Sequence, residues 1–144
     1  MKVSNLKNDF LTISEYESIL LKKKKIEKKE FQRLEFLGDK VLGLILASLL
    51  FDKHNDFTEA MLSRTVAYLC SGKVLHEIAC DLSLDSYFKE KEKIISKKGL
   101  ADCLEVIIGT FYLNNGYQKT KNMIFRLWKT KLNKVNSIKV DSKT

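Results

Sequence analysis

Residues 34–42, LEFLGDKVL, form an apolar segment that two carboxylates, Glu35 and Asp39, interrupt. The two residues are four apart, so on a helix their side chains share one face, one turn above the other. A carboxylate in an apolar helix has to be paired, hydrogen-bonded or metal-bound, because burying it bare is costly. The segment therefore predicts a central helix that contributes functional carboxylates as well as core residues.

A second acidic pair, Asp102 and Glu105, interrupts another strongly apolar segment, residues 100–108. Four carboxylates that converge from two helices would repel one another, and a divalent cation would relieve that repulsion. Hard oxygen ligands suit Mg²⁺ or Mn²⁺. Acidic pairs with this spacing are also common on solvated helix faces. Spacing alone does not show that the two helices face each other, so both interpretations stay open from the residues.

The apolar residues recur with a helical period and proline is absent, so we expect an all-α fold. Gly116 is expected to end a helix, because glycine readily takes a positive φ. The charged segment 89–98 is expected to be a loop. The helices are expected at about residues 30–52, 59–69 (after the N-cap Thr58), from the N-cap Ser71 through 82, and 100–115, with an earlier helix starting at Ser14 and a last amphipathic helix carrying Trp128.

Length and charge are those of one basic domain: 144 residues, with 26 Lys and Arg against 18 Asp and Glu, for a net charge of +8. This excess suggests a polyanionic partner, nucleic acid or an anionic membrane surface. No apolar run approaches the ~20 residues that span a bilayer, and the first residues do not resemble a signal peptide. The chain is therefore expected to be cytoplasmic, without a membrane partner.

The cysteines predict neither a disulfide framework nor a zinc site. Three is an odd number, and no CxxC motif is present. The spacings do not match those of structural zinc ligands. The residues considered are Cys70, His76, Cys80 and Cys103.

Three motifs, in order, resemble the ribonuclease III family. Residues 32–42 resemble its signature, NERLEFLGD followed by a small residue and VL. Residues 100–113 resemble its second acidic motif, LADxxEAxIGAxYL, and residues 59–75 resemble the helix pair between them. The resemblance covers residues 14–132 and implies a ribonuclease III endonuclease-domain-like helical bundle.

The resemblance also implies an activity: a homodimeric, Mg²⁺-dependent endoribonuclease that cuts double-stranded RNA, each subunit cutting one strand. Mn²⁺ is a plausible substitute for Mg²⁺. The catalytic and metal-binding residues it implies are Glu35, Asp39, Asp102 and Glu105. The alternative is a catalytically inactive relative that kept the fold as an RNA-binding or ribosome-associated scaffold. Four retained carboxylates favour the enzyme, because a scaffold has no reason to hold so much like charge together.

Further positions follow from the same resemblance. Glu59 matches an acidic position near the cleft, and Phe36 matches an aromatic residue of the dimer interface, although ordinary core filling explains Phe36 equally well. Gln32 stands where the family has Glu, so a charge beside the cleft is lost. Residues 1–138 are expected to form the endonuclease domain. Residues 139–144 are expected to be a basic tail that resembles the start of a double-stranded-RNA-binding domain.

Overall fold

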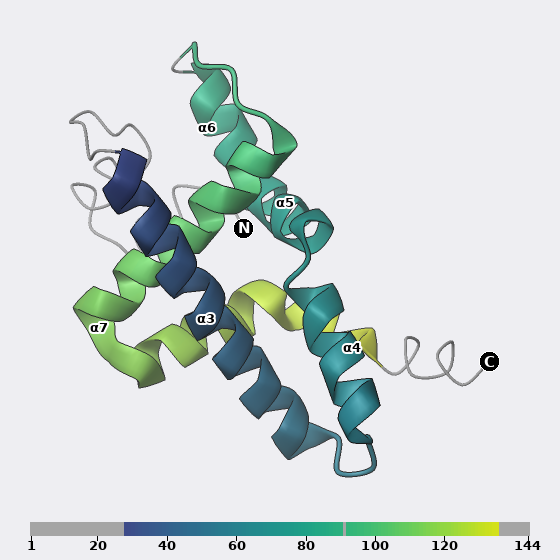
Figure 1. Cartoon of the computed structure of the whole chain (residues 1–144). Helices are drawn as coiled ribbons and strands as arrows, with labels where there is room; N and C mark the ends of the chain where they lie inside the picture. The colour runs from purple at the N-terminus through teal and green to yellow at the C-terminus, as the bar shows by residue number, and fades with distance from the viewer. Residues whose placement is uncertain (1–27, 91, 136–144) are drawn as a thin grey trace.

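The computed structural model describes residues 28–90 and 92–135, and within these ranges it contains helices and no strand. The all-α expectation is confirmed. The expected helix from Ser14 and the tail at 139–144 lie outside the described residues. The helices, shown in Figure 1, are α3 (Lys28–Lys53), α4 (Glu59–Leu69), α5 (Gly72–Asp81), α6 (Leu84–Glu90) and α7 (Lys97–Asn133).

The expected starts of α4 and α5 are confirmed by their caps. Thr58 Oγ1 accepts a hydrogen bond from the backbone N–H of Met61 at 3.2 Å. Ser71 Oγ accepts one from the backbone N–H of Val74 at 3.3 Å. Each hydroxyl satisfies a donor that the first helical turn would otherwise leave without a partner.

Gly116 divides α7 into two halves, as expected from the sequence. Its φ of 84° is positive, and its ψ of 179° differs from the left-handed helical value. This region of backbone conformation is essentially restricted to glycine. The chain therefore changes direction at Gly116, and Figure 1 shows the two halves of α7 lying along different parts of the bundle.

The expectation of a loop over residues 89–98 is wrong at both ends. α6 continues to Glu90, because Leu84, Tyr87 and Phe88 share one face and bury it against the core. At the other end α7 already begins at Lys97, where Ser96 Oγ accepts a hydrogen bond from the N–H of Gly99 at 2.9 Å. The high charge of the segment reflects its solvated sides and does not prevent helix formation.

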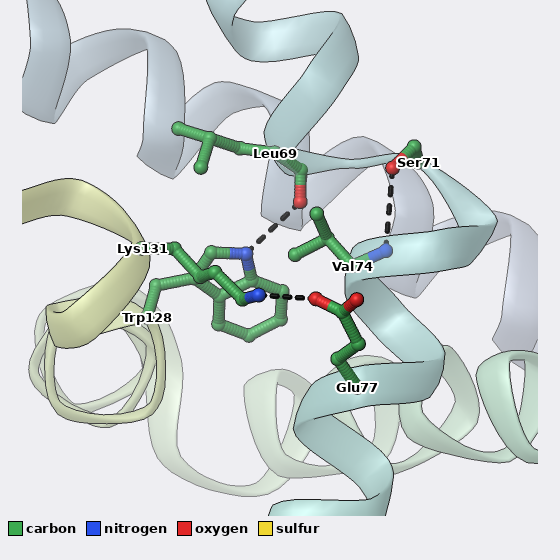
Figure 2. A network of polar contacts seen from close by, with 6 residues as sticks. All are labelled: Leu69, Ser71, Val74, Glu77, Trp128 and Lys131. Atoms are coloured by element: carbon green, nitrogen blue, oxygen red, sulfur yellow. Dashed lines mark hydrogen bonds and ion pairs between the residues drawn. The ribbon is translucent and has the colours of Figure 1, made fainter. Parts of the chain in front are cut away.

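The core lies mainly between α3 and α7, which pack on each other more extensively than any other pair of described helices. Trp128, on the second half of α7, is fully buried, and its Nε1 donates a hydrogen bond to the carbonyl of Leu69 at 2.9 Å. Nearby, Lys131 forms an ion pair with Glu77. Figure 2 shows how these contacts attach α7 to the end of α4 and to α5. No described helix is long and apolar enough to cross a bilayer.

Candidate active site

Two glycines allow α3 and α7 to cross with their backbones in contact. A Cβ atom on Gly38 would lie 1.8 Å from the carbonyl oxygen of Glu105, and one on Gly109 would lie 2.5 Å from that of Leu34. Both distances are far below van der Waals contact, so no larger residue fits at either position without moving a helix. This crossing brings the acidic pair of α3 next to the acidic pair of α7.

The carboxylates converge at this crossing. One oxygen from each of Glu35, Asp102 and Glu105 lies within 4.8 Å of the other two. Asp39 lies beside Glu105, close enough to raise the pKa of the Glu105 carboxyl. The structure thus brings Glu35, Asp102 and Glu105 together and leaves Asp39 beside Glu105, outside that group; we call these four residues the acidic cluster.

Burial and mutual repulsion raise the pKa values of two carboxyl groups in the acidic cluster. Glu105 is only 8% exposed, and burial, together with the neighbouring Asp39, raises its pKa to about 8. The pKa of Glu35 is also raised, first by burial and then by Asp102. Without a cation, part of the acidic cluster therefore holds protons near neutral pH, because the charged forms disfavour one another.

The donors of the acidic cluster fit a hard divalent cation. They are carboxylate oxygens from two rigid helices, which Mg²⁺ and Mn²⁺ prefer to nitrogen or sulfur. Exposed acidic groups often occur without an ion, but Glu105 is buried, and its charged form needs a compensating partner. Glu35, Asp102 and Glu105 could hold the cation, with Asp39 beside Glu105.

A cavity of about 710 Å³ opens beside the acidic cluster, and both acidic and basic side chains line it. Lys97 and Lys98 belong to the charged segment already noted in the sequence, whereas nothing in the sequence pointed to Cys70 or Lys73. Burial, then the charges of Asp39 and Glu105, raises the pKa of the Cys70 thiol to about 12, so the thiol is a neutral part of the wall. The residues lining the cavity include Glu35, Asp102, Glu105, Cys70, His76, Lys73, Lys97 and Lys98.

The other predicted positions lie away from this cavity. Glu59 is exposed on the first turn of α4, where it accepts a hydrogen bond from Ser63 Oγ at 2.8 Å, and it does not line the cavity. Gln32 and Phe36 line a second cavity of about 570 Å³, together with Leu113. Phe36 is 64% exposed, so the core-filling interpretation is wrong. Its predicted role in a dimer interface stays a prediction.

Comparison with known proteins agrees with the motifs. Residues 4–132 match a family model described as Ribonuclease-III-like. Ribonuclease 3 of Pelagibacter ubique is 37% identical over 118 residues, which are 78% of this chain and 53% of that protein. Ribonuclease 3 of Francisella tularensis subsp. novicida is 34% identical over 124 residues, which are 81% of this chain and 54% of that protein. The chain thus spans about half the length of the curated relatives it matches.

Solved structures share the fold. The nuclease domain of ribonuclease III from Campylobacter jejuni, described as flexible in a region involved in dimer formation, aligns with a TM-score of 0.68 and 27% identity. The alignment covers 90% of this chain and 97% of that one. Dicer from Pichia stipitis aligns with a TM-score of 0.69 over 89% of this chain and 59% of that one. Its 22% identity supports the fold alone.

Proposed function

Because this chain belongs to the Ribonuclease-III-like family, as its acidic motifs predicted, we propose that it is a Mg²⁺-dependent endoribonuclease that cleaves double-stranded RNA. The observation that carries the proposal is the convergence of Glu35, Asp102 and Glu105 at the α3–α7 crossing. Structured RNA is the substrate that fits a basic chain with mixed charge around its cavity, because duplex RNA is contacted mainly through phosphates and 2′-hydroxyls.

The residues of the site have different proposed roles. Glu35, Asp102 and Glu105 would hold the cation, and Mn²⁺ is a plausible substitute for Mg²⁺. When bound, the cation supplies Lewis-acid polarisation of the phosphate and lowers the pKa of the attacking water. Glu105 has to release its carboxyl proton to become a ligand, so metal binding is coupled to proton release. Lys73 and Lys97, at the cavity, provide positive charge for the RNA backbone.

The test is incubation of the purified chain with long duplex RNA, with Mg²⁺ and with EDTA in its place. We expect discrete shortening of both strands only with Mg²⁺, and no cleavage of single-stranded RNA of the same sequence. Low salt is the favourable condition, because protein–phosphate contacts weaken as salt rises. Duplex binding without cleavage at high protein concentration would contradict the enzyme and favour the scaffold alternative.

We further propose that the protein acts as a homodimer in which Phe36 contributes to the interface. Phe36 is largely exposed beside a cavity that three leucines, Leu34, Leu37 and Leu113, line together with charged and polar residues. An aromatic side chain with an apolar core around it and a polar rim is a typical anchor at protein interfaces. A homodimer would supply two catalytic sites, one for each strand of a duplex. The three free cysteines of the described residues, Cys70, Cys80 and Cys103, accord with a reducing, cytoplasmic location.

Phe36→Ala is expected to weaken the dimer at least about 30-fold, because truncating an interface anchor commonly costs about 2 kcal/mol or more. Light scattering over a concentration series would measure the dissociation constant. Phe51→Ala is the matched control: Phe51 is 68% exposed on the same helix and does not line the second cavity. Equal dimer affinity in both variants would contradict a role for Phe36 in the interface.

A further inference from the structure

A lysine ammonium already lies on the acidic cluster. Lys98 Nζ donates a hydrogen bond to Asp102 Oδ2 at 2.9 Å, across one turn of α7. The Lys98 side chain is 80% exposed, whereas that of Asp102 is 23% exposed. The exposed ammonium group of Lys98 is thus paired with a carboxylate that lies in the wall of the cavity.

The interaction extends beyond one ion pair. The charges of Glu35 and Glu105 also act on Lys98, so its ammonium interacts with the same three carboxylates that could hold a cation. Within the part of the chain that the structure describes, the other cation in an ion pair with a cluster member is Lys40, whose Nζ lies 3.6 Å from Asp39 Oδ2, outside that group of three. Lys98 therefore partly neutralises the proposed metal ligands themselves.

We propose that Lys98 is a built-in counter-cation of the acidic cluster, which a divalent cation displaces from Asp102, and that Lys98 thereby sets the metal affinity of the site. The proposal rests on the proposed function, since it assumes that the acidic cluster binds metal. Displacement is easy, because an exposed lysine pair contributes little and the four-carbon stem is flexible. The ammonium nevertheless stays tethered to α7 one turn away, where it repels the incoming charge.

The sign of the effect follows from Coulomb's law. In the metal-bound state, the ammonium lies a few ångströms from a divalent cation, and their repulsion raises the free energy of that state. In the metal-free state, the ammonium forms only a weak exposed ion pair, which stabilises that state by less. Removing the charge of Lys98 should therefore tighten metal binding. Salt screens such an exposed interaction, so the effect should shrink as ionic strength rises.

Calorimetric titration of the full chain with Mn²⁺, without RNA, tests the proposal. We expect Lys98→Gln to bind Mn²⁺ about tenfold more tightly than the wild type at low salt, and Lys98→Arg to stay within about twofold of it. The matched control is Lys129→Gln, the same charge change on the second half of α7, away from the cavity of the acidic cluster. It should have little effect.

The outcomes separate the two proposals. A wild type that binds no Mn²⁺ would overturn the metal site and with it the role of Lys98. A wild type that binds Mn²⁺ while Lys98→Gln binds equally or more weakly would overturn the role of Lys98 alone. An increase in affinity equal to that of Lys129→Gln would show an effect of net charge, and would also overturn it. An increase specific to Lys98→Gln that shrinks at high salt supports it.

Discussion

Glu105→Gln is expected to reduce Mg²⁺-dependent cleavage of duplex RNA by more than about 100-fold, because even outer partners of metal ligands contribute 10–100-fold. The amide keeps the shape of the side chain but cannot carry the negative charge that a cation needs. Glu105 is the buried member of the acidic cluster, and Asp39 lies beside it. No other described side chain is placed to substitute for it from within the helix core.

Single-turnover cleavage of a long duplex measures this loss without interference from product release. Glu90→Gln is the control, since it makes the same chemical change at an exposed position at the end of α6. Dimerisation should be unchanged in both variants. Cleavage by Glu105→Gln at a rate close to that of Glu90→Gln would mean that the acidic cluster is not the catalytic site.

The same variant should show the opposite effect on stability. Glu105 has a pKa of about 8 in the folded chain against an ordinary value of 4.5. Between these pH values the folded chain holds a proton that the unfolded chain has released, so the free energy of unfolding falls as pH rises. Metal-free Glu105→Gln should therefore unfold at a higher temperature than the wild type at pH 8, with little difference near pH 4. Identical pH dependence in the two proteins would contradict the raised pKa.

Gly38→Ala is expected to lower the free energy of unfolding by about 3 kcal/mol or more, at the upper end of what overpacking costs. The new Cβ would lie 1.8 Å from the carbonyl oxygen of Glu105, a backbone atom that cannot rotate away. α3 and α7 would have to separate, and the acidic cluster would separate with them. Cleavage should fall together with stability, which chemical denaturation and the single-turnover assay measure in parallel.

Gly43→Ala provides the matched comparison. It lies on the same helix, and a Cβ there would meet nothing within 4 Å. Because alanine favours a helix over glycine by up to about 1 kcal/mol, this variant should be as stable as the wild type or more stable. Gly109→Ala, on the other side of the crossing, should resemble Gly38→Ala. If Gly38→Ala and Gly43→Ala behaved alike, the close crossing would be wrong.

Much of the local structure could be predicted from the sequence, because its signals are local. Thr58 and Ser71 cap helices through contacts three residues away, and the positive φ of Gly116 depends on its own lack of a side chain. α6 was missed because its buried face, which includes Tyr87 and Phe88, is short and adjoins a charged segment. A helix of seven residues is too short to show a clear helical period of apolar residues beside so many charged ones.

The wall of the cavity could not be predicted, because residues distant in sequence hold it in place. Cys70, in the turn between α4 and α5, and Lys73, in the first turn of α5, line the cavity beside the acidic cluster. That turn is attached to the bundle by the hydrogen bond from Trp128 to the carbonyl of Leu69 (Figure 2). No periodicity connects positions 59 residues apart.

The sequence by itself determined that the chain is helical, that it belongs to its family, and that each acidic pair shares a helix face, because a period of 3.6 residues is a property of one helix. Only the tertiary structure decided that the two faces meet. Gly38 and Gly109 look like ordinary small residues until their backbones are seen in contact. Removing two Cβ atoms lets two helices approach closely enough for repelling carboxylates to share one site, and the packing of the surrounding core holds them there.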